Sequence, residues 1–148
     1  MLRLGSGAGF SSDRLQPAID LARDGALDWL VFETIGERTL AFGHRDRQLN
    51  PQRGYNPQLA KRMRGVLSHC RANNTRIMTN MGVANVAAAA QVIIDVAREL
   101  GLNGLRVAAL EGDEVTDLMS PETVLFDYGG RKISEVGRPL VGANAYLG

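Results

Sequence analysis

Short apolar runs alternate with amphipathic stretches along the first 110 residues. Residues 29–32 and 77–78 are continuous apolar runs. A third predicted strand, residues 106–110, consists of Arg106 followed by four apolar residues. A run without polar alternation is typical of a parallel strand that is covered on both faces. A very short strand is predicted at residues 3–4, and residues 139–145 predict a fifth strand near the end of the chain.

The amphipathic stretches between these runs predict helices. One begins at Ser12 or Asp13 as its cap and ends near Arg23; a second leads from residues 33–39 to about Arg47. The clearest helix spans residues 57–72, where a single apolar stripe is predicted, with the basic residues Lys61, Arg62, Arg64 and Arg71 off it. That stripe comprises Leu59, Met63, Val66, Leu67 and Cys70. A fourth helix follows Asn85 and stops at Gly101.

Strands and helices that alternate with short connections predict an α/β fold with a parallel sheet and helices on both faces. We prefer an open doubly wound sheet, and the first part of a β/α barrel is the alternative. Residues 124–126 and 131–133 predict a small hairpin around residues 127–130. We expect one α/β domain over residues 1–148, and, because no helix follows the last strand, the N-terminal part of a longer polypeptide.

Composition narrows the classes of function. The net charge is +1 and the arginines are scattered with few aromatic residues among them, which argues against a nucleic-acid partner. No apolar run has the length of a membrane span, and a single cysteine fits a cytoplasmic protein. The first half of the fourth helix carries no charge, so we expect a homo-oligomer, or the remainder of a longer chain, to cover it.

Polar residues follow each predicted strand. In parallel sheets, ligands bind beyond the carboxyl ends of the strands, so these residues predict a site for a small-molecule or CoA-linked substrate. They are Ser6, Glu33, Asn80, Glu111, Asp113 and Asn144. The turn from the third strand into the fourth helix adds Gly82 and Asn85, with free backbone N–H groups suited to an anion or a carbonyl oxygen. The alternative is that Asn85 only caps the helix and Gly82 only permits the turn.

Two further features bear on phosphate binding. Gly5, Gly7 and Gly9 could bring backbone close to a phosphate, but Phe10 stands where a dinucleotide fingerprint needs its third glycine, so a nucleotide site is the weaker interpretation. The alternative is a plain tight turn. Arg38 either pairs with Glu33 or Glu37, or clamps a substrate carboxylate or phosphate.

The acids allow two chemical roles. Glu33, Glu111 and Asp113 offer the oxygen ligands that a divalent cation prefers, or one of them acts as a general base. Helix capping is the competing explanation for Asp113. We interpret Cys70, on the apolar stripe, as a packing residue rather than a nucleophile.

Five short segments in order resemble the acyclic terpene utilisation (AtuA) family. They are residues 5–11, 28–39, 79–85, 111–114 and 143–148. The resemblance implies a role in the bacterial breakdown of citronellol- or geraniol-type branched acids as CoA thioesters, with a lyase step as one suggested reaction. Family members are considerably longer. The sequence departs from the family pattern at Val86, where proline is expected, and at residues 34–36.

Three functions follow as hypotheses. The first is an enzyme of acyl-CoA catabolism, in which Glu33 or Glu111 is the base or metal ligand and Asn80, Asn85 and the Gly82 turn hold an oxyanion or carboxylate. The second is a non-catalytic subunit that binds a nucleotide or acyl-CoA. The third is an interaction scaffold that uses the uncharged fourth helix.

Overall fold

The structure is a computed structural model that describes residues 1–145. The chain divides into two compact units, residues 1–110 and residues 111–148. The first contains a parallel sheet of three strands in the order β1-β2-β3, which confirms the predicted α/β class. The strands are β1 (Leu4–Ala8), β2 (Trp29–Phe32) and β3 (Arg76–Thr79). Their consecutive order shows neither a closed barrel nor a reversal of strand order within the described residues.

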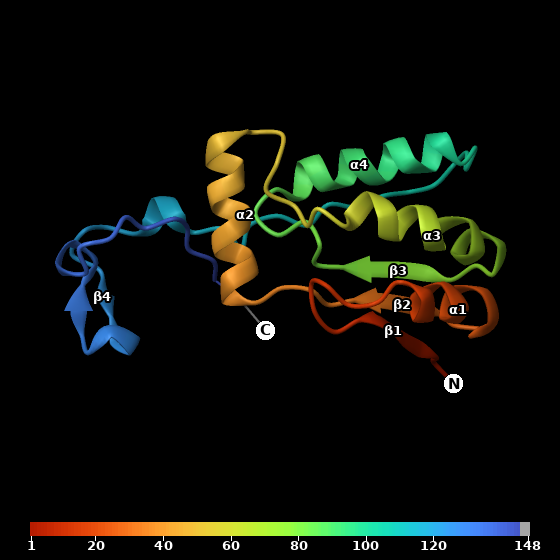
Figure 1. The fold of residues 1–148 in the computed structure, drawn as a ribbon, viewed down its shortest axis with the longest axis horizontal. Coiled ribbons are helices and arrows are strands. Elements are labelled where there is room, and N and C mark those ends of the chain that lie inside the picture. The colour runs from red at the N-terminus through yellow and green to blue at the C-terminus, as the bar shows by residue number, and fades with distance from the viewer. Residues whose placement is uncertain (146–148) are drawn as a thin grey trace. The chain divides into compact units, whose positions relative to one another are not determined.

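Four helices accompany this sheet: α1 (Gln16–Asp24), α2 (Glu37–Leu49), α3 (Leu59–Ala72) and α4 (Val86–Glu99). The helix predicted at residues 57–72 is confirmed as α3, and the one after Asn85 as α4. Helix α1 packs on β1 and β2, α3 packs on α1 and β3, and α4 packs on α3 (Figure 1). No described helix has the length and apolar character needed to cross a membrane.

One face of the sheet carries the core. Leu30 and Phe32 of β2 are buried with Met63 and Val66 of α3. On the opposite face, Leu4 and Met78 are exposed. Because α1 and α3 contact each other on the first face, helices cover one face of the described sheet rather than the predicted two. The apolar runs in β2 and β3 therefore predict more covering of the strands by helices than the structure shows.

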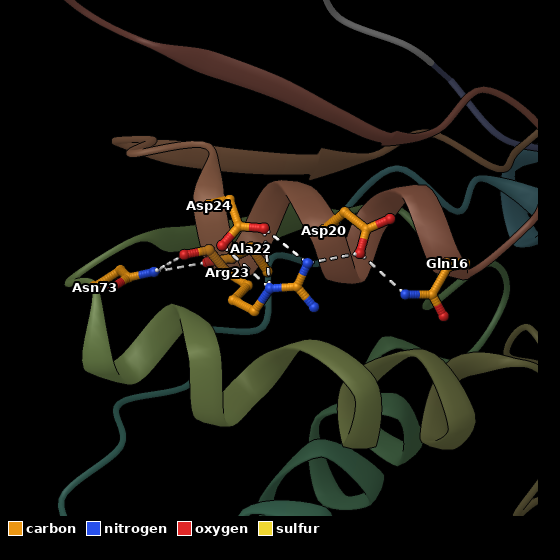
Figure 2. A network of polar contacts seen from close by, with 6 residues as sticks. All are labelled: Gln16, Asp20, Ala22, Arg23, Asp24 and Asn73. Carbon is orange, nitrogen blue, oxygen red and sulfur yellow. Dashed lines mark hydrogen bonds and ion pairs between the residues drawn. The ribbon is translucent and has the colours of Figure 1, made fainter.

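The helix ends are fixed differently from the sequence prediction. Neither Ser12 nor Asp13 caps α1, because the helix begins after Leu15 without a side-chain cap. At the other end, the amide Nδ2 of Asn73, which follows α3, donates to the carbonyl oxygens of Ala22 and Arg23 at 2.8 and 2.9 Å (Figure 2). These bonds satisfy carbonyl groups that a helix C-terminus leaves open, and they join α1 to α3.

The second unit holds a hairpin, and two predicted strands are absent. The hairpin pairs β4 (Val124–Leu125) with β5 (Arg131–Lys132) in antiparallel fashion, as predicted. The prediction of strands at residues 106–110 and 139–145 is wrong: the first has no paired neighbour among the described residues, and Leu110 is 80% exposed. The second contributes only an isolated bridge between Asn144 and Glu114. An apolar run becomes a strand only where another backbone completes its hydrogen bonds.

Candidate functional site

Glu33 and Asn80 meet at the carboxyl end of the sheet. Glu33 follows β2 and Asn80 follows β3, and parallel pairing of these strands places both residues at the same edge. The amide Nδ2 of Asn80 donates to Oε1 of Glu33 at 2.9 Å. The backbone amide of Ile35 donates to the same oxygen at 3.1 Å. Oε1 of Glu33 is thus held by two donors, while Oε2 has no partner among residues 1–145.

Thr34 fixes the orientation of the Asn80 amide. The backbone N–H of Thr34 donates to Oδ1 of Asn80 at 2.8 Å, so that Nδ2 must face Glu33. Thr34 is itself buried. Because this bond comes from the backbone N–H of Thr34, the residue type at position 34 gives no signal of it in the sequence. One N–H of Asn80 therefore remains available for a ligand oxygen.

The side chain of Asn85 forms all of its hydrogen bonds with backbone groups of the chain. Its Oδ1 accepts from the amide of Ala88 at 3.2 Å, which is a helix N-cap for α4. Both hydrogens of its Nδ2 are used, by the carbonyl oxygens of Pro51 at 2.8 Å and Arg53 at 2.6 Å. The cap and the two loop contacts thus use all the polar atoms of the Asn85 side chain, which leaves none for a ligand.

Replacing Asn85 by alanine is expected to lower the free energy of unfolding by about 1–2 kcal/mol, because a helix cap and two loop contacts are lost. Urea denaturation followed by circular dichroism measures this loss. Asn85→Asp is the matched variant: it keeps the cap but sets a carboxylate against two carbonyl oxygens. We expect it to be destabilised too, and a wild-type midpoint for both variants would contradict the assignment.

The turn between Asn80 and Asn85 is strained at Val83. This buried residue has φ 52°, a left-handed conformation that a β-branched side chain rarely adopts. Its amide donates to the carbonyl oxygen of Asn80 at 3.1 Å, and the neighbouring Ala84 amide donates to Gly54 at 2.9 Å. Gly82 lies against Val86, where an added Cβ would come within 3.1 Å. Packing holds this turn in place, and strain of this kind is commonly found beside functional sites.

The glycine-rich segment lies partly inside the sheet. Ser6 and Gly7 belong to β1 rather than to a turn after it. A Cβ on Gly7 would lie 2.6 Å from the ring of Phe32, so Gly7 serves core packing. The hydroxyl of Ser6 donates to the carbonyl oxygen of Ala8 at 3.5 Å, its one hydrogen bond within residues 1–145. Gly9 follows the strand, and its amide donates to Oδ2 of Asp13 at 3.0 Å.

Arg38 stacks on an aromatic ring instead of pairing with Glu33 or Glu37. Its guanidinium lies 5.5 Å from the ring centroid of Phe42, and that of Arg45 lies 5.0 Å from the same ring. Phe42 is 44% exposed. Cation–π contacts hold both arginines over the ring. Nη2 of Arg45 also contacts Oδ1 of Asp46 at 3.4 Å, whereas, within residues 1–145, Arg38 keeps its hydrogen-bonding edge open for an anionic group.

The remaining predicted residues lie in the second unit. Nδ2 of Asn144 donates to Oδ2 of Asp113 at 3.0 Å, and Glu111 is exposed. Glu33 belongs to the first unit, so the carboxylates predicted as cation ligands are divided between the units. Within residues 1–145, no three His, Cys, Asp or Glu side chains lie close enough together to hold a metal ion.

Cys70 and Arg62 of α3 are both buried. Burial raises the pKa of Cys70 to about 11, so the neutral thiol packs in the core as predicted. Arg62, predicted off the apolar stripe, is also buried, and this prediction is wrong. It lies three residues after Leu59 and four before Val66, a spacing that places it on the stripe and could have revealed it.

Comparison with known proteins identifies the family of this chain. No curated protein and no solved structure matches the chain. The family model described as "Acyclic terpene utilisation family protein AtuA" matches residues 2–148. The chain therefore belongs to the acyclic terpene utilisation family AtuA.

Proposed function

We propose that this chain belongs to an enzyme activity that converts a branched acyl-CoA or carboxylate in acyclic terpene utilisation, with lyase-type cleavage as its reaction. The family supports the pathway. The observation that carries the enzymatic proposal is the hydrogen bond between Glu33 and Asn80, which joins an acid and an amide donor at the sheet edge where α/β proteins bind ligands.

The two side chains have complementary roles in such a cleavage. Glu33 has one carboxylate oxygen held by Asn80 and Ile35, and its other oxygen takes a proton from the substrate hydroxyl. As that proton leaves, the hydroxyl carbon becomes a carbonyl, its bond to the carbon beside the thioester breaks, and the electron pair of that bond forms an enolate with negative charge on the thioester oxygen. The remaining N–H of Asn80 stabilises that charge by donating a hydrogen bond. The enolate carbon then takes the proton back from Glu33, which restores the carboxylate.

Replacing Glu33 by glutamine tests this assignment. The variant keeps an oxygen to accept from Asn80 but has no base, so we expect kcat/KM for a branched 3-hydroxyacyl-CoA to fall about 100-fold with an unchanged melting temperature. The matched control is Glu37→Gln, which removes an equal charge from an exposed residue in the first turn of α2. Wild-type turnover in Glu33→Gln would remove Glu33 from the mechanism.

A CoA- or nucleotide-binding subunit without catalysis is the second candidate. The exposed Phe42 ring with Arg38 and Arg45 stacked on it favours this function, because such a surface suits an adenine ring and its phosphates. Calorimetry with CoA and with the thioester separates the candidates. Binding of CoA by the wild-type protein, with no turnover of any branched thioester, would favour the binding subunit.

A further inference from the structure

The guanidinium of Arg62 is buried, and two of its three nitrogens lack a hydrogen-bond acceptor within the part of the chain that the structure describes. Arg62 is 0% exposed and lies in the first turns of α3. Its Nη2 donates to the backbone oxygen of Asp13 at 2.5 Å. Its Nε and Nη1 are buried and have no acceptor among the described residues. Burying a charged group with open donors is costly, so proteins keep such a group where something offsets the cost.

The neighbours of Arg62 do not supply that compensation. The ring of Phe32 lies 5.9 Å from its Cζ, which gives a cation–π contact and no acceptor. The charge of Asp13 acts on Arg62, but the Asp13 carboxylate accepts hydrogen bonds from the amides of Gly9 and Arg14 at 3.0 and 2.8 Å. These backbone bonds lower the pKa of Asp13, whereas burial lowers the pKa of Arg62 against the pull of Asp13.

The loop that touches Arg62 has donors of its own. Residues 9–13 connect β1 to the segment before α1, at the carboxyl end of the sheet. Within the described part of the chain, the amides of Phe10, Ser11 and Ser12 have no acceptor. The buried Asn56 anchors the loop through a hydrogen bond from Nδ2 to the Ser11 hydroxyl at 3.1 Å. Free amides and a guanidinium at one loop make an environment that attracts an anion.

We propose that Arg62 and the loop of residues 9–13 form a site for an oxyanion, the carboxylate or phosphate of a ligand. The ligand reaches the guanidinium when the loop exchanges its Asp13 contact for the anion. The open groups that favour an anion are Nε and Nη1 of Arg62 and the amides of residues 10–12, all of which are donors. The identity of the ligand as a substrate rests on the proposed function, but the site itself is tested by binding alone.

The experiment is calorimetric titration of the full chain with inorganic phosphate and, separately, with 3-methylbutanoate, at ionic strength held constant with sodium chloride. We expect saturable binding of at least one anion, and which of the two binds identifies the group as phosphate or carboxylate. Arg62→Met should weaken that binding about tenfold or more. Arg71→Met is the matched control, since it removes an exposed arginine from the same helix and should bind as wild type.

A second readout separates binding from a purely structural role. Removing an uncompensated buried charge should leave the ligand-free melting temperature of Arg62→Met unchanged or raised. If that variant does not fold, Arg62→Lys, which keeps the charge but loses the planar fork, should still weaken binding. Absence of binding in the wild type, or wild-type affinity in the Arg62 variant that folds, would overturn the proposal. These titrations measure binding and not turnover, so failure of the anion site and failure of the catalytic proposal would be distinguishable.

Discussion

Phe32→Ala is expected to lower the free energy of unfolding by about 3–5 kcal/mol, the range for removing a buried aromatic side chain. Phe32 is 1% exposed and belongs to the core formed by β2 and α3. Its loss opens a cavity between β1 and α3 and removes the ring beneath Arg62. Urea denaturation followed by circular dichroism, with the slope checked against wild type, measures the change.

Phe32→Leu is the control for this prediction. It keeps most of the apolar volume, so its cost should stay below about 1.5 kcal/mol. The cavity left by Phe32→Ala can shrink only if Arg62 and Gly7 move toward it, and neighbouring residues hold both in place. Arg62 is bonded to Asp13, and Gly7 lies in the ladder of β1. A loss below about 1 kcal/mol for Phe32→Ala would show that the core collapses freely around this position.

The elements that the sequence predicts well are those with local signals. Helix α3 has a repeating apolar stripe, α4 has a cap at Asn85 and a stop at Gly101, and β2 is an uninterrupted apolar run. Residues 107–110 have the same apolar character but pair with no strand in the described part of the chain, so they are irregular. A strand depends on hydrogen bonds to a distant segment, and composition does not contain that information.

The candidate site shows the same division. The expectation that strand-end residues gather at one edge correctly places Glu33 beside Asn80, because parallel pairing of β2 and β3 follows from the alternation of elements. The sequence does not reveal which partners each side chain hydrogen-bonds. Asn80 keeps a free N–H while Asn85 uses all of its donors on the chain, although both asparagines lie in one turn. The charge of Arg62 predicts an exposed position, whereas its spacing from Leu59 and Val66 places it on the buried stripe of α3.

Gly7→Ala is expected to destabilise the protein by about 2–3 kcal/mol, although a phosphate-binding glycine would tolerate a methyl group with little effect on folding. The added Cβ would lie 2.6 and 2.8 Å from two carbons of the Phe32 ring, too close without movement of the ring. Gly9→Ala is the matched control, because a Cβ there meets nothing within 4 Å. Its midpoint in urea should remain within experimental error of wild type.

A double-mutant cycle decides between packing and ligand binding at Gly7. If the methyl group is costly only because it meets the Phe32 ring, Gly7→Ala should cost less than about 1 kcal/mol in the Phe32→Ala background. It could even restore stability there by filling part of the cavity, since residual cavity volume sets much of the cost. Strictly additive costs would show that the glycine is required by the backbone of β1 itself. Non-additivity would assign Gly7 to the core, and the glycine-rich segment would then contribute to a ligand site only through residues 9–13.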